Sequence, residues 1–119
     1  MTRIRMISFD KSLYDRLGVN PDPPLPGSIV GFAKQTLGKQ PINGLRHPSE
    51  GNTNGWYVWC GDWSGADEFF EPLHVEHVKD YLPQIMRYFD LPPGYRFLID
   101  EEGHEDIWFD EGLMEIGDA

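Results

Sequence analysis

The chain has 119 residues, with 20 acidic and 10 basic side chains, 39% hydrophobic residues and a single cysteine. This length suits one domain, and the aromatic content supplies material for a core, so we expect neither a multidomain nor a fully disordered protein. Cys60 has no intramolecular partner for a disulfide. No apolar run approaches the roughly 20 residues of a membrane span, and the N-terminal residues lack the apolar segment of a signal peptide. These features predict a soluble cytoplasmic protein.

Charge is unevenly distributed along the chain. Residues 1–46 hold seven basic and three acidic side chains, whereas residues 47–119 hold three basic and 17 acidic ones. A field of this sign repels nucleic acid and anionic lipid and attracts basic proteins. We therefore expect a basic protein as the partner, and neither nucleic acid nor a membrane. Solubility alone is the plainer interpretation of the same charge.

Residues 1–27 are expected to form an N-terminal arm with a proline-rich linker. A short strand is predicted over residues 3–9. A brief helix follows, capped by Asp10 or Ser12 and ending at Gly18. Residues 20–27 (NPDPPLPG) contain four prolines, so this stretch is extended or turning rather than helical.

The domain itself is predicted over residues 28–119 and begins with two strands. The first covers residues 28–33 (SIVGFA) and the second residues 55–60 (GWYVWC). Apolar side chains alternate onto both faces of the second strand, so we expect it in the centre of the sheet. Between the strands, residues 34–54 are rich in Gly, Pro, Asn and polar side chains. We expect a long loop there, with a turn of helix at residues 34–37.

An amphipathic helix and a β-hairpin are predicted in the second half. Apolar residues recur at helical spacing at Val75, Val78, Leu82, Ile85 and Phe89. Pro83 interrupts this stripe, so we expect one kinked helix over about residues 74–90 or two short helices, with Pro83 in the first turn of the second. Strands over residues 95–100 and 105–109 then form a hairpin whose turn uses Gly103. The predicted fold is a single α+β domain, a small antiparallel sheet with one kinked helix packed on it.

Histidines are the first candidates for a metal site. His74 and His77 are three residues apart, which places both imidazoles near one side of the predicted helix. His104 or a carboxylate is the candidate third ligand, and a divalent-metal-binding protein or metal-dependent enzyme is therefore our alternative function. The spacing differs from the i, i+4 arrangement of zincin metalloproteases. The plainer interpretation is that His74 borders the helix start and His77 is exposed.

No other pattern supports catalysis. The carboxylates occur in adjacent clusters typical of solvated surfaces, not as a separated acid and base. The glycines of residues 51–55 lead into a strand without a lysine, so they do not predict a phosphate-binding loop. We interpret Cys60 as a small buried hydrophobic residue. The sequence thus predicts a non-enzymatic protein without a cofactor.

Aromatic residues beside carboxylates point to a protein interface. Trp56 and Trp59 lie on opposite faces of their strand, so we expect one in the core and the other semi-exposed, while Trp63 lies in a turn that need not bury it. Exposed aromatic residues anchor interfaces and acidic residues steer a basic partner, although filling a small core is the plainer role for each tryptophan. The candidate partner-binding residues come from residues 62–71 and from the acidic hairpin: Asp62, Trp63, Asp67, Glu68, Glu71, Glu101, Glu102, Glu105, Asp106 and Asp110.

Four segments carry a resemblance to a known family: residues 55–62 (GWYVWCGD), 72–77 (PLHVEH), 91–99 (LPPGYRFLI) and 105–110 (EDIWFD). Together they resemble class thirty-three of the bacterial polymorphic-toxin immunity proteins, over about residues 28–111. The resemblance implies a cytoplasmic antidote that binds and blocks a toxin domain without catalysis. A third alternative is a homodimer formed through the sheet edge of the strand at residues 55–60.

Overall fold

The computed structural model describes residues 10–115, which form a six-stranded sheet and several short helices. The strands are β1 (Ile29–Phe32), β2 (Ile42–Arg46), β3 (Thr53–Cys60), β4 (Glu71–His74), β5 (Tyr95–Ile99) and β6 (Glu105–Phe109). The helices are α1 (Lys11–Leu17) and α2 (Val78–Tyr81), with 3-10 turns η1 (Lys34–Thr36), η2 (Val75–His77), η3 (Pro83–Tyr88) and η4 (Glu111–Met114). The strand expected at residues 3–9 lies outside the described residues. The predicted α+β class is confirmed.

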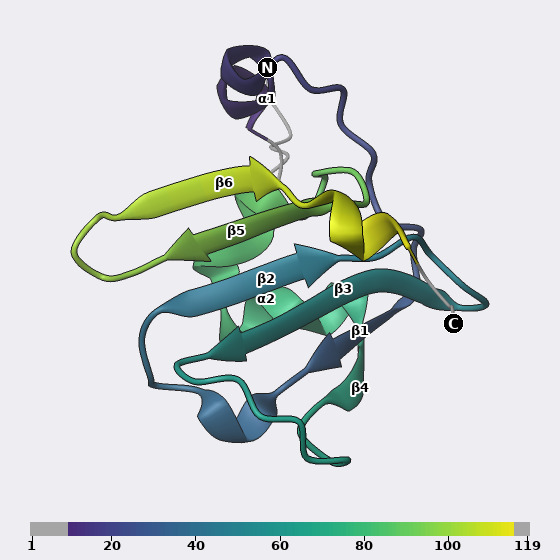
Figure 1. Cartoon of the computed structure of the whole chain (residues 1–119), viewed down its shortest axis with the longest axis vertical. Helices are drawn as coiled ribbons and strands as arrows, with labels where there is room; N and C mark the ends of the chain where they lie inside the picture. Colours follow the sequence, from purple (N-terminus) through teal and green to yellow (C-terminus); the bar gives the residue numbers. More distant parts are fainter. Residues whose placement is uncertain (1–9, 116–119) are drawn as a thin grey trace, which may run out of the picture.

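The sheet is mixed, which corrects the expectation of an antiparallel one. Its strand order is β4-β1-β3-β2-β5-β6, and β1 pairs with β3 in parallel while every other neighbouring pair is antiparallel. The parallel pair arises because β3 turns back from β2 and inserts between β2 and β1 (Figure 1). The strand with the Gly-Trp sequence is therefore central, as predicted. Its two edges are both paired, so it offers no free edge for a homodimer, and the edge strands are β4 and β6.

Two strands, β2 and β4, were not predicted from the sequence. β2 lies within residues 34–54, where Asn43 and Gly44 weaken the strand pattern. Gly44 is required there because a Cβ would overlap the ring of Phe97 on the neighbouring strand β5. β4 contains Pro72, which an edge strand tolerates because its missing N–H removes no hydrogen bond from a second neighbour.

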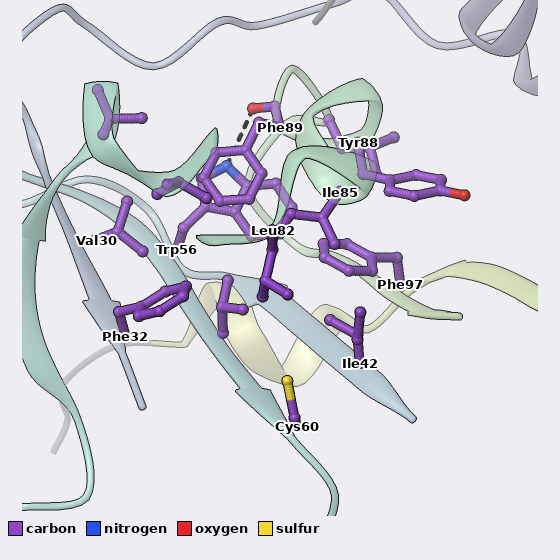
Figure 2. Packing of buried hydrophobic residues seen from close by; sticks show 14 of the residues in the cluster. Val30, Phe32, Ile42, Trp56, Cys60, Leu82, Ile85, Tyr88, Phe89 and Phe97 are labelled. Atoms are coloured by element: carbon purple, nitrogen blue, oxygen red, sulfur yellow. Dashed lines mark hydrogen bonds between the residues drawn. The ribbon is translucent and has the colours of Figure 1, made fainter. Parts of the chain in front are cut away.

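The predicted apolar stripe covers one face of the sheet. The single kinked helix expected over about residues 74–90 is not formed: His74 ends β4, and the stripe is divided into η2, α2 and η3. Helix α2 ends because Leu82, the residue before Pro83, has a non-helical backbone (φ −139°, ψ 69°), and Pro83 begins the next helical turn, as expected from the sequence. Figure 1 shows α2 behind the sheet, and Figure 2 shows Leu82, Ile85 and Phe89 packed against Trp56 and Phe97. This layer buries the core side of the sheet.

The segment before β1 is fixed to the same layer. Asp10 caps α1 by accepting from the backbone N–H of Leu13, and α1 ends at Gly18 with φ 68°, both as predicted. The hydroxyl of Tyr14, on α1, donates to the carbonyl of Arg87 at 2.9 Å. In the proline-rich stretch, Gly27 N–H donates to the carboxylate of Glu76 at 2.6 Å. Helix α1 and the proline-rich stretch thus contact the helical layer that covers one face of the sheet.

Candidate partner-binding face

The face of the sheet that α2 and η3 do not cover is called the open face here. Strand alternation and the pairing register of β2, β3, β5 and β6 place these side chains on it: Asn43, Leu45, Tyr57, Trp59, Arg96, Leu98, Asp106 and Trp108. Figure 1 shows the C-terminal turn η4 in front of the sheet, on the side opposite α2. There the imidazole Nδ1 of His47 lies 3.0 Å from the carbonyl oxygen of Leu113.

The loop between β3 and β4, residues 61–70, folds back onto the open face. Phe70 meets Tyr57 edge to face with ring centroids 5.1 Å apart, and meets Trp59 at 6.0 Å. Phe69 packs with Trp59 in a second, smaller core cluster. Trp59 is therefore only 6% exposed, and the expectation that it would be semi-exposed is wrong. Trp63, on the same loop, is 62% exposed.

A pocket of about 440 Å³ opens between this loop and the strands. Its walls are mainly apolar, formed by Leu45, Tyr57, Trp59, Trp63 and Phe70, and two polar side chains, His47 and Arg96, complete it. This set is called the aromatic pocket below. Tyrosine, tryptophan and arginine are the residue types most enriched where protein interfaces concentrate binding energy.

Arg96 links the aromatic pocket to the edge strand β6. Its Nη1 donates to the carboxylate of Asp110 at 2.9 Å, and its guanidinium lies 5.5 Å from the ring centroid of Trp108. The hydrogen bond from Arg96 is the main cause that holds the pKa of Asp110 below its usual value of 3.8. Asp110 also accepts from the backbone N–H of Gly112 and thereby caps η4.

Three of the predicted acidic residues, Asp62, Asp67 and Glu68, lie on the loop that carries Trp63. They are exposed, and their carboxylates form no hydrogen bond or ion pair with any residue in the 10–115 range. We call these three residues the acidic rim. Such carboxylates are free to meet a partner.

The acidic hairpin divides between the two faces. Asp106 is on the open face and pairs with His104 at 2.9 Å, which raises the pKa of His104. Glu105 is on the helix-covered face, where it accepts a hydrogen bond from Tyr88 and lies 3.6 Å from Nη1 of Arg87.

The remaining predicted acidic residues lie away from the aromatic pocket. Glu101 and Glu102 are exposed at the hairpin tip. Glu71 shares the face of Phe32, its register partner, and so points to the helix-covered side. The tip and the loop after β3 nevertheless lie at the same end of the sheet, because Ile42 of β2 pairs with both Cys60 and Ile99.

The histidines of the alternative function are not brought together. His74 and His77 have ring centroids 6.5 Å apart beside the edge strand β4, whereas His104 precedes the opposite edge strand β6. Five interstrand spacings, roughly 24 Å, separate those edges. No group of three metal-ligating side chains forms among the residues that the structure describes. Cys60, as predicted, is buried, and burial raises the pKa of its thiol.

Leu45, His47, Arg96 and Trp108 were not singled out from the sequence. The first two depend on β2, which was predicted as loop. The sequence signal that could have indicated this strand is the period-two alternation in which Ile42, Gly44 and Arg46 face one side and Asn43 and Leu45 the other.

Comparison with known proteins identifies one family. The model of the Imm33-like domain matches residues 10–110, most of the chain. No curated protein sequence and no solved structure shows significant similarity to this chain. Within residues 10–115, no helix has the length and apolar character needed to cross a membrane.

Proposed function

This chain belongs to the Imm33-like family of immunity proteins, and from that premise we propose that it neutralises a toxin domain by binding it stoichiometrically in the cytoplasm, without catalysis. The observation that carries the binding mode is the open face. There, an exposed tryptophan and an aromatic pocket lie beside carboxylates that have no partner within residues 10–115. Aromatic anchors supply binding energy, and unpaired charges supply steering and specificity.

The charge of the chain supports a basic partner. The formal net charge is −10, and the acidic rim and the hairpin tip lie at one end of the sheet. A surface of this sign accelerates encounter with a cationic toxin domain and disfavours nucleic acid. The contacting residues proposed here are the acidic rim, Trp63 and the exposed carboxylates of the hairpin, Glu101, Glu102 and Asp106.

A pull-down at low and at high salt, followed by a titration, tests the proposal. The tagged chain is incubated with lysate and secreted fraction of the source cells, and retained proteins are identified. We expect a basic toxin domain that is retained at low salt and weakened at high salt. Purified toxin activity is then titrated with the chain, and inhibition is expected to be complete at a 1:1 ratio, with intact toxin recovered from the complex.

Two results would contradict the proposal. Full inhibition at a small fraction of one equivalent indicates that the chain modifies or destroys the toxin catalytically. Absence of any retained toxin domain at both salt concentrations, together with no inhibition of any basic toxin domain in the titration, removes the immunity function itself.

A further inference from the structure

The aromatic pocket has a mainly apolar lining, and the acidic rim lies on the loop beside it. The two regions therefore suit different side chains of a partner. Resting on the proposed function, we infer that the pocket receives one apolar side chain of the toxin domain, from a segment that carries lysine or arginine on both sides of it.

The lining of the pocket favours a neutral, apolar occupant. Five of its seven lining residues are aromatic or aliphatic. Its permanent charge is the guanidinium of Arg96, which already donates to Asp110 at 2.9 Å. A cationic side chain would lose its hydration beside another cation, and an anionic one would approach through a negative field to a guanidinium already paired. An apolar side chain incurs neither cost and gains from burial against Trp63.

The surroundings of the pocket favour a basic segment. Trp63 and Phe70 both line the pocket; Asp67 and Glu68 of the acidic rim lie on the stretch of loop between them, and Asp62 directly precedes Trp63. Its carboxylates have no partner among residues 10–115, so cations of the partner would not need to displace an existing ion pair. When the apolar side chain is seated in the pocket, residues on either side of it reach this loop.

The other large surface pocket fits this role less well. A cavity of about 620 Å³ lies beside the proline-rich segment, and charged residues of both signs line it, among them Glu76, Lys79 and Asp80. Glu76 is already bound to the backbone of Gly27. The aromatic pocket instead combines an exposed tryptophan with acids that are unpaired in the described part of the chain, the arrangement in which a desolvated anchor is surrounded by charged contacts.

The apolar pocket and the acidic rim should affect different rate constants of complex formation. Burial of an anchor side chain controls how slowly the complex dissociates, whereas charges at the margin control how rapidly the partners meet. Loss of the pocket should therefore raise the dissociation rate, and loss of rim charge should lower the association rate in a salt-dependent way.

The experiment measures both rate constants by surface plasmon resonance, with the purified toxin domain recovered in the pull-down as the probe. Trp63→Ala is expected to raise the dissociation rate about 30-fold or more and to leave the association rate within about threefold. Leu25→Ala is its matched control, because Leu25 is 75% exposed on the proline-rich segment. This control should dissociate at the wild-type rate.

The rim is tested by Asp67→Lys against Glu50→Lys, an equal change of charge at the other end of the sheet. Asp67→Lys should slow association several-fold at low salt and much less at high salt, and Glu50→Lys should have the smaller effect. A photoreactive benzoylphenylalanine at position 63 should crosslink to an apolar toxin residue that has lysine or arginine nearby on both sides.

The inference is overturned if Trp63→Ala dissociates like Leu25→Ala while the wild-type chain still binds and neutralises the toxin. It is also overturned if the crosslink falls on an acidic or uncharged segment. In both cases the immunity function stands. If the wild-type chain neither binds nor neutralises any toxin domain, the proposed function itself fails, and this result is distinct from the other two.

Discussion

The indole Nε1 of Trp56 donates a 3.1 Å hydrogen bond to the carbonyl oxygen of Phe89, and the two rings stack with centroids 4.7 Å apart (Figure 2). Trp56 is fully buried on the central strand, and Phe89 directly follows η3. One side chain therefore satisfies a buried carbonyl and fixes the helical layer to the sheet.

Replacing this tryptophan should cost stability. Trp56→Phe leaves the Phe89 carbonyl without its partner and opens a small cavity, so we expect a loss of about 2 to 4 kcal/mol in the free energy of unfolding. Urea denaturation measures the change. Trp63→Phe is the matched control, expected within about 0.5 kcal/mol of wild type because Trp63 is mostly exposed. Equal losses in the two variants would contradict this account of Trp56.

Arg46 should be a second determinant of stability. It is 4% exposed, and its guanidinium donates to three backbone carbonyls, those of Asp22, Asn54 and Leu91, at 2.7 to 3.0 Å. Arg46→Met removes all three donors, so we expect a loss of about 2 to 4 kcal/mol. Because one acceptor belongs to the proline-rich stretch, limited proteolysis should also cut residues 20–27 faster.

The matched control is Arg16→Met. Arg16 is an exposed arginine whose guanidinium lies 3.4 Å from Glu105. An exposed ion pair of this kind contributes about 0 to 1 kcal/mol, so this variant should remain near wild type. Unchanged proteolysis in Arg46→Met would show that the proline-rich stretch does not depend on this side chain.

The elements predicted correctly are those whose local pattern agrees with their tertiary environment. The stripe from Val75 to Phe89 packs one face against the sheet, and Pro83 acts locally through its ring. Gly103, at φ 91°, provides the left-handed backbone that its turn requires. In each case the signal lies within a few residues of the element.

The elements that were missed depend on distant partners. β2 is a strand because β3 and β5 both pair with it, and its Gly44 accommodates a ring from β5 that sequence proximity does not reveal. The burial of Trp59 likewise depends on Phe69 and Phe70, ten and eleven residues further along the chain. The aromatic residues of the pocket could therefore be noticed in the sequence. Its other lining residues, Leu45, His47 and Arg96, could be assigned to it only once the order of the strands was known.

Glu105 and Glu102 should differ in their effect on folding, although both belong to the acidic hairpin. Glu105 accepts from Tyr88 and lies near Arg87 and Arg16, whereas Glu102 is exposed at the turn. We expect Glu105→Gln to lower the free energy of unfolding by about 1 to 2 kcal/mol, because charge-assisted hydrogen bonds are lost. Glu102→Gln should change it by less than about 0.5 kcal/mol. Thermal and urea denaturation of the two variants provide the comparison, and a Glu105 variant as stable as the Glu102 variant would contradict it.

The ion pair between Arg96 and Asp110 should make part of the stability sensitive to acid. The pKa of Asp110 is lowered from 3.8, chiefly by the hydrogen bond from Arg96, so the folded state favours the carboxylate. Its contribution is present above the unfolded-state pKa and is lost as the pH falls through the lower folded-state pKa. Asp110→Asn should therefore have a lower melting temperature than wild type at about pH 7, and this difference in melting temperature should disappear toward about pH 2. Asp67→Asn removes an equal charge without breaking any ion pair of residues 10–115 and serves as the control. The Arg96–Asp110 pair holds Arg96 in the lining of the aromatic pocket. This role would be contradicted if the difference in melting temperature between wild type and Asp110→Asn stayed constant or increased in acid.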